Sequence, residues 1–173
     1  MLKVLLAGGG TGGHINPALA IASIIKQRHP DAEFLFAGTP NGMEATLVPK
    51  AGYNFAPIKI SGFQRKVTPK NLVRNAKAAA YLSMSGHRAK QIISGFKPDI
   101  VIGTGGYVSG PVLRQAAKLG IKCCIHEQNA FAGVANKMLA PKVDAVMLAM
   151  PEAEKYFDAK NKPIVTGNPV RTS

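Results

Sequence analysis

The stretch MLKVLLAGGGTGGHINPALA, residues 1–20, decides the fold of this chain. Residues 2–7 form an apolar run that predicts a buried strand, and residues 8–13 contain five glycines. The segment 16–25 begins with Asn-Pro and is apolar-periodic, which predicts a helix with proline in its first turn. Glycine lets a ligand approach the backbone closely, and a helix start offers free N–H groups and a positive dipole end. The stretch therefore predicts a strand–loop–helix unit that binds phosphate.

The glycine spacing also fits two other interpretations. Gly8, Gly10 and Gly13 match the dinucleotide fingerprint, which needs an acidic residue about 20 positions further on to bind the ribose. The second predicted strand, residues 33–37, ends instead in Gly-Thr-Pro, and this argues against an NAD-dependent oxidoreductase. The remaining alternative is a structural turn whose glycines only let the helix pack closely on the sheet.

Strands and helices alternate along the rest of the chain. Further strands are predicted at residues 54–60, 98–102, 122–125, 145–148 and 164–165. Helices are predicted at residues 42–51, 69–93, 111–119, 134–139 and 151–157. This alternation predicts an α/β fold with a Rossmann-like, doubly wound parallel sheet of about seven strands. Ligands bind beyond the carboxyl ends of such strands, so we expect the loops at His14, Gly105 and Glu127 to converge on one cleft.

The composition is that of a globular protein, with 46% hydrophobic and 18% charged residues in a chain of 173. The apolar runs are too short to span a membrane, and the start lacks the features of a signal peptide, so the expected location is cytosolic. Cys123 and Cys124 are adjacent in a predicted strand and therefore face opposite sides of the sheet. We expect two buried, reduced thiols that lack the spacing of metal ligands.

The net charge of +13 is distributed unevenly. Ten basic residues and no acidic residue lie between Glu44 and Asp99, which indicates an anionic partner: nucleic acid, a membrane surface or a phosphorylated ligand. Apolar residues cover much of the predicted helix 69–93, which fits either a membrane-surface patch with a basic rim or a well-buried helix. Nucleic acid is disfavoured, because the chain is only 6% aromatic and has no recognition motif.

Four motifs in order strongly resemble the MurG family, the UDP-N-acetylglucosamine transferases of peptidoglycan synthesis. They are GGTGGHINPALA at 9–20, GGYVSGP at 105–111, HEQNAFAG at 126–133 and GNPVR at 167–171. The resemblance covers the whole chain and implies one half of the two-domain GT-B fold. Residues 1–173 would be the amino-terminal, acceptor-side domain, and the carboxy-terminal domain that binds most of the donor would be absent.

The resemblance implies an inverting transfer of N-acetylglucosamine from UDP-N-acetylglucosamine to the 4-hydroxyl of undecaprenyl-pyrophosphoryl-N-acetylmuramoyl-pentapeptide. The enzyme would act as a peripheral protein on the cytoplasmic face of the bacterial inner membrane, with other cell-wall synthesis proteins as candidate partners. The sugar nucleotide is a substrate, so no cofactor is expected. The sequence has no Asp-x-Asp motif and no His/Cys cluster, so we expect no metal that the protein itself ligates.

The family motifs also imply roles for particular residues. At the reaction centre lie His14 and Glu127, either of which could be the general base. Donor-contacting positions are Thr11, Gly12, Gly13, Asn129 and Arg171. The expected seat of the acceptor diphosphate comprises Gly103, Thr104, Gly105, Gly106 and Tyr107. The predicted membrane-facing residues are Phe63, Lys66, Lys70, Leu72, Arg74, Lys77 and Leu82.

Overall fold

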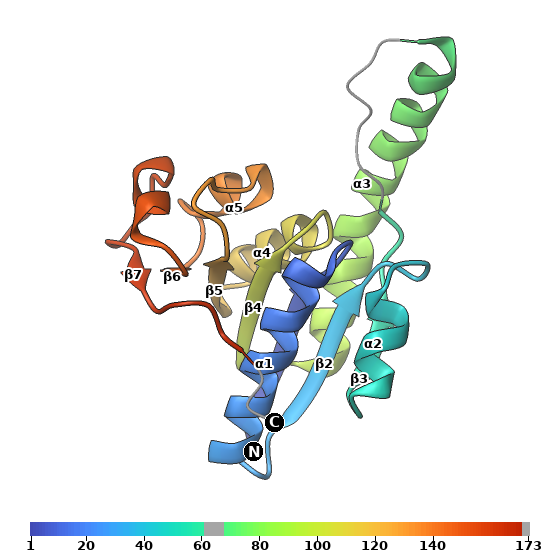
Figure 1. Ribbon diagram of the computed structural model, residues 1–173. Coiled ribbons are helices and arrows are strands. Elements are labelled where there is room, and N and C mark those ends of the chain that lie inside the picture. The colour runs from blue at the N-terminus through green and yellow to red at the C-terminus, as the bar shows by residue number, and fades with distance from the viewer. Residues whose placement is uncertain (61–67, 171–173) are drawn as a thin grey trace.

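A parallel β-sheet forms the centre of the molecule (Figure 1). The computed structural model describes residues 1–60 and 68–170, with the backbone alone for residues 69–80 and 82. Within these residues the sheet has seven strands: β1 (Lys3–Gly8), β2 (Glu33–Gly38), β3 (Asn54–Pro57), β4 (Ile100–Gly105), β5 (Lys122–Glu127), β6 (Ala145–Leu148) and β7 (Ile164–Val165). The predicted α/β class and the parallel sheet are confirmed.

The strand order, β3-β2-β1-β4-β5-β6-β7, places the switch point of the sheet between β1 and β4. The chain first builds outward from β1 to β3, and the long helix α3 (Pro69–Phe96) then carries it back to the other side of β1. The register pairs Leu6 with Ile102 and Gly8 with Gly105, so the two glycine loops leave the sheet side by side. This is the position at which doubly wound sheets bind ligands.

Helices cover both faces of the sheet (Figure 1). Apolar side chains of α1 (Gly12–Arg28) and α2 (Glu44–Lys50) pack on one face with Val4 and Leu6 of β1. Those of α3, α4 (Ser109–Lys118) and α5 (Val134–Leu139) pack on the other face with Leu5. Alternate residues of one strand therefore enter different cores, as the pleat requires.

The two cysteines follow the same rule. Cys123 belongs to the core under α3 and α4, whereas Cys124 belongs to the core under α1. Both are buried free thiols, and burial raises the pKa of the Cys124 thiol to about 12. The prediction of buried, unpaired cysteines on opposite faces is confirmed.

Several predicted element boundaries were wrong. Helix α1 begins at Gly12, inside the glycine loop, so Pro17 lies in the second turn and not in the first. Strands β4 and β5 continue to Gly105 and Glu127, because their polar and glycine residues still pair with neighbouring strands. Strand β3 stops at Pro57, and the acidic segment η1 (Pro151–Tyr156) is a 3-10 helix.

The carboxy-terminal part of α3 packs on the sheet through Ala89, Ile92 and Ile93, while its first half extends beyond the sheet (Figure 1). Met84, near the middle of the helix, is 63% exposed. Of the predicted membrane-facing residues, Phe63 and Lys66 lie outside the described residues. The side chains of the others are not described, namely Lys70, Leu72, Arg74, Lys77 and Leu82. No described helix is both long and apolar enough to cross a bilayer.

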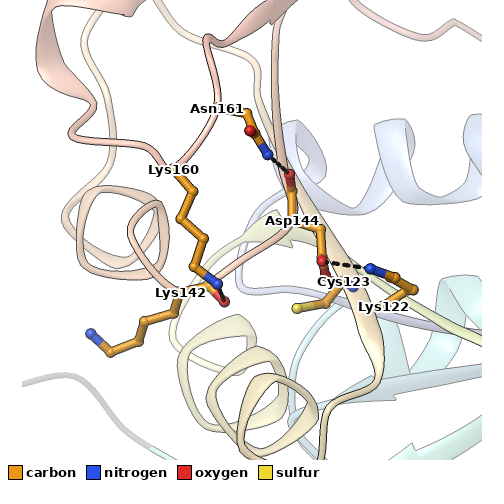
Figure 2. Close-up of polar contacts among 6 residues, drawn as sticks. All are labelled: Lys122, Cys123, Lys142, Asp144, Lys160 and Asn161. Carbon is orange, nitrogen blue, oxygen red and sulfur yellow. Dashed lines mark hydrogen bonds and ion pairs between the residues drawn. The ribbon is translucent and has the colours of Figure 1, made fainter.

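Asp144 ties the amino-terminal ends of β5 and β6 together (Figure 2). Its carboxylate accepts hydrogen bonds from the Cys123 N–H at 2.9 Å and from Lys122 Nζ at 3.1 Å, and its backbone carbonyl accepts one from Asn161 Nδ2 at 3.0 Å. The Asp144 N–H also donates to the Cys123 carbonyl oxygen at 2.8 Å, so backbone pairing begins one residue before the first pair of the β5–β6 ladder, Cys124 and Ala145. The Cys123 N–H and then Lys122 hold the pKa of the Asp144 carboxyl below its usual value.

We expect Asp144→Ala to lower the free energy of unfolding by about 1 kcal/mol, the size of a hydrogen bond to a partly exposed carboxylate. Because the folded-state pKa is lowered, this stabilisation is present above the unfolded pKa and is lost as the pH falls through the folded value. Urea unfolding of the wild type and the variant, at neutral pH and in acid, measures both effects. Asp158→Ala, at an exposed position, is the matched control; an equal loss in both variants would contradict the assignment.

Candidate active site

The two glycine loops of the switch point pack backbone against backbone. Gly106 has φ +81°, and a Cβ on it would collide with the carbonyl oxygen of Gly9. A Cβ on Gly8 would likewise collide with the Thr104 hydroxyl, which donates to the His14 carbonyl oxygen at 2.7 Å. The alternative of a purely structural turn therefore explains some of these glycines, since they are needed where one loop touches the other.

A buried carboxylate, Glu44, supports the first loop. It is 1% exposed and accepts hydrogen bonds from the Gly10 N–H at 3.1 Å and from the Thr39 N–H and hydroxyl at 2.8 and 2.6 Å. Burial alone would raise the pKa of the Glu44 carboxyl, but the bonds from Thr39 and Gly10 outweigh it and leave that pKa lowered. Because its oxygens are engaged with the protein, Glu44 is not available to bind a ribose, which argues further against a dinucleotide site.

His14 lies in the first turn of α1, half-buried beside the second loop. Its Nδ1 lies 3.0 Å from the Thr104 carbonyl oxygen and 3.2 Å from Gln128 Oε1. Its ring occupies the space where a side chain on Gly105 would lie. Both partners of Nδ1 are acceptors, so Nδ1 carries the proton and Nε2 keeps a lone pair. This nitrogen has no partner within the described residues and can accept a proton from a ligand.

Glu127 was predicted at the reaction centre together with His14, but both of its carboxylate oxygens accept hydrogen bonds from the protein. It is 1% exposed, and Oε1 accepts from the N–H and Nδ2 of Asn129, each at 3.0 Å. Oε2 accepts from the Gly133 N–H and from Asn136 Nδ2, each at 2.9 Å. Four donors thus surround this carboxylate and shape the loop after β5.

His126 and Gln128 link this loop to the carboxy-terminal segment. His126 is 1% exposed, and its Nε2 lies 3.0 Å from the Gly167 carbonyl oxygen. Gln128 Nε2 lies 3.0 Å from His126 Nδ1 and donates to the His126 carbonyl oxygen at 2.9 Å. Burial lowers the pKa of the His126 imidazole, against the opposing effects of the Gly167 carbonyl and the Glu127 charge, which favours its neutral form.

The predicted acceptor-diphosphate residues divide into a buried and an exposed part. Gly103, Thr104 and Gly105 are buried, whereas Gly106 is half-buried and Tyr107 is 63% exposed. Buried Ser109 fastens this loop: its hydroxyl accepts from the Gly105 N–H and lies 2.7 Å from the Ala7 carbonyl oxygen. The first three residues therefore shape the loop, and only its tip is open to a ligand.

A cleft of about 460 Å³ opens where the start of α1 faces the carboxy-terminal segment. Gly12, Gly13 and Asn16 line it on one side and residues 168–170 on the other. The N–H groups of Gly12 and Gly13 have no acceptor within the described residues, as is usual for a helix start, and can bind an anion.

The other residues predicted to contact the donor do not line this cleft within the described part of the chain. Thr11 and Asn129 are exposed, at the start of α1 and in the loop after β5 respectively. Arg171 lies outside the described residues. Among residues 1–60 and 68–170 no group of three or more His, Cys, Asp or Glu side chains could hold a metal ion.

The family model for the glycosyltransferase family 28 N-terminal domain matches residues 4–148. The chain belongs to this family. As a family 28 domain it is 54% identical over 171 residues to a protein of Alkaliphilus oremlandii named UDP-N-acetylglucosamine–N-acetylmuramyl-(pentapeptide) pyrophosphoryl-undecaprenol N-acetylglucosamine transferase. The match covers 99% of this chain and 46% of the relative. A protein of Clostridioides difficile with the same name is 49% identical, with 99% and 41% covered. The chain thus spans about half the length of the curated relatives it matches.

Solved structures agree with this family assignment. The domain superposes on the crystal structure of Acinetobacter baumannii MurG with a TM-score of 0.79 at 33% identity, covering 98% of this chain and 47% of that one. A Streptomyces glycosyltransferase gives a TM-score of 0.60 at 18% identity, which shows the fold alone. The architecture is that of one half of a GT-B glycosyltransferase, as the motifs implied.

Several residues of this site were absent from the predicted site residues, among them Glu44, Gln128 and Ser109. One sequence feature could have indicated Glu44: it is an acidic residue in the first turn of a predicted helix, and that helix follows the carboxyl end of a predicted strand, where ligands bind. Gln128 lies between two predicted site residues, Glu127 and Asn129, but no local sequence pattern predicts its hydrogen bond to His14. The partner of Ser109, Ala7, is 102 positions away, and no local pattern reveals that contact.

Proposed function

We propose that residues 1–173 are the acceptor-side domain of an inverting UDP-N-acetylglucosamine transferase, completed by a carboxy-terminal donor-binding domain. The proposed acceptor is undecaprenyl-pyrophosphoryl-N-acetylmuramoyl-pentapeptide. The names of relatives about twice as long support this assignment, as does the family 28 match. The sugar nucleotide is a substrate, and no cofactor is part of the proposal.

The observation that carries the proposal is the state of His14. Two acceptors engage its Nδ1, so its Nε2 is free to receive a proton beside the helix start. In the proposed reaction, the acceptor 4-hydroxyl gives its proton to Nε2 while its oxygen attacks the anomeric carbon of N-acetylglucosamine. The bond from that carbon to the UDP oxygen breaks, UDP leaves with the electron pair, and the configuration inverts.

The choice of His14 over Glu127 as the base rests on hydrogen bonding. The four donors around Glu127 occupy its carboxylate, whereas His14 has an unpartnered acceptor nitrogen within the described residues. In this proposal Glu127 shapes the loop that presents Asn129. The free N–H groups of Gly12 and Gly13 would stabilise diphosphate charge in the cleft.

The test of the function uses a chimera of residues 1–170 with the carboxy-terminal half of the Alkaliphilus oremlandii relative. We expect the chimera to transfer labelled N-acetylglucosamine to the lipid-linked acceptor, and the 173-residue chain alone to give no transfer, because one side of the cleft is missing. UDP-glucose is the donor control. A folded chimera without transfer, or a chain that works equally well alone, would refute the proposal.

We also propose that the first half of α3 and the preceding segment attach the protein to an anionic membrane surface. The support is the run of ten basic residues without an acid between Glu44 and Asp99, together with the extension of α3 beyond the sheet (Figure 1). Each Lys or Arg near an anionic surface contributes about 1 kcal/mol, so a few are enough for reversible binding. Apolar residues such as Phe63, Leu72 and Leu82 would add a part that is insensitive to salt.

Flotation with anionic and neutral vesicles at low and high salt measures this attachment. Binding should favour anionic vesicles, weaken with salt, and fall when four basic residues are replaced by Gln: Lys66, Lys70, Arg74 and Lys77. The control removes the same charge from exposed lysines elsewhere: Lys118, Lys137, Lys142 and Lys162. Equal loss in both variants would mean that net charge, and not this segment, drives binding; no binding at all would exclude the membrane role.

A further inference from the structure

A chain of hydrogen bonds runs from His14 to the carboxy-terminal segment of the domain. His14 Nδ1 lies 3.2 Å from Gln128 Oε1, Gln128 Nε2 lies 3.0 Å from His126 Nδ1, and His126 Nε2 lies 3.0 Å from the Gly167 carbonyl oxygen. It joins α1, the end of β5 and the segment that follows β7. Of its side chains, only His14 takes part in the proposed reaction.

The Gly167 carbonyl determines which atom donates and which accepts in each of these hydrogen bonds. A backbone carbonyl can only accept, so His126 Nε2 carries a proton. In the neutral ring His126 Nδ1 then accepts, and Gln128 must present its NH₂ group to it. The same NH₂ group donates to the His126 carbonyl oxygen at 2.9 Å. A flipped amide would place oxygen against oxygen there, so the orientation of Gln128 is set by two independent contacts.

This orientation turns Gln128 Oε1 toward His14. We propose that Gln128 is a positioning residue that holds His14 in the tautomer with the proton on Nδ1, leaving Nε2 as the proton acceptor of the proposed transferase reaction. The inference rests on the proposed function only for the catalytic role that it gives to Nε2. The tautomer of His14 can be measured without an activity assay. A free neutral imidazole prefers the opposite tautomer, with the proton on Nε2, so the protein must supply the preference.

The Thr104 carbonyl also accepts from Nδ1, at 3.0 Å, and is the competing explanation. Thr104 and Gln128 lie on different elements, β4 and the loop after β5. Two acceptors from two elements restrain both the orientation of the ring and the position of its proton. The Thr104 carbonyl alone favours the same tautomer, and the proposal is that, without the second acceptor, it does not hold the ring against rotation about the side-chain bonds. The proposal therefore predicts that loss of the Gln128 oxygen alone releases the tautomer.

The experiment records long-range ¹H–¹⁵N spectra of the ¹⁵N-labelled 173-residue chain in alkaline buffer, where imidazole rings are neutral. The two ring nitrogens have different shifts in the two tautomers, and His14→Gln identifies the signals of His14. Gln128→Met keeps the length of the side chain but removes the acceptor. Gln128→Glu keeps an acceptor oxygen but removes the NH₂ donor.

We expect the wild type and Gln128→Glu to show His14 protonated on Nδ1, and Gln128→Met to show a mixture or the reverse. Gln91→Ala is the matched control, because Gln91 contacts His87 on the exposed face of α3 and should change only the His87 signals. Wild-type His14 shifts in Gln128→Met would overturn the proposal and assign the tautomer to Thr104 alone. If Gln128→Met gives no folded spectrum, Gln128→Ala replaces it.

Discussion

Replacing His14 by alanine in the active chimera should lower turnover at least ~100-fold, the usual contribution of a general base. The expected loss is in kcat, because the imidazole accepts its proton only as the new bond forms. The Michaelis constant for the sugar nucleotide should change much less, since the N–H groups of Gly12 and Gly13 remain. Steady-state kinetics with the donor and the lipid-linked acceptor varied separately measure both quantities.

His29→Ala is the matched control for this prediction. His29 follows α1 at its opposite end, is exposed, and uses only its backbone N–H in the cap, so its replacement should leave turnover unchanged. Glu127→Gln tests the alternative base. Normal turnover in His14→Ala together with lost turnover in Glu127→Gln would move the base to Glu127 and refute the assignment to His14.

The order of strands and helices and the parallel sheet could be predicted from the sequence, for a physical reason. Strands of a parallel sheet are buried on both faces and read as short apolar runs, as in β1 and β6, and each is followed by a helical pattern. The convergence of the loops at His14, Gly105 and Glu127 also followed, because the carboxyl ends of parallel strands share one edge. His14 and Thr104, 90 positions apart, are in fact hydrogen-bonded.

Local patterns failed where packing between loops decides the structure. Glycines 12 and 13 read as loop, yet they form the first turn of α1, and Thr104 reads as a ligand-binding residue, yet it is fully buried. Glu127 and His14 look equivalent as polar residues after a strand. Only the positions of Asn129, Gly133 and Asn136 reveal that one is enclosed and the other free, and these depend on how the loop folds back.

Glu44 carries the second large effect. Glu44→Ala should lower the free energy of unfolding by about 3 kcal/mol, because it removes the buried carboxylate that accepts three hydrogen bonds from Gly10 and Thr39. Glu44→Gln should cost less, since an amide keeps one acceptor oxygen but presents an NH₂ group to other donors. Glu33→Ala is the control: Glu33 forms a 3.3 Å surface ion pair with Lys3, and such pairs contribute less than about 1 kcal/mol.

The effect of Glu44 should also depend on pH in a defined direction. The folded-state pKa of this carboxyl is lowered, so the stabilisation is fully present above the unfolded pKa and is lost as the pH falls through the folded value. Urea unfolding of the wild type and Glu44→Ala from neutral pH into acid should therefore show their difference shrinking. A difference that stays constant into acid would mean that the charge on Glu44 is not what supports the loop. Because that loop leads directly into the helix start at Gly12 and His14, a loosened loop in a still-folded chimera should also weaken binding of the sugar nucleotide.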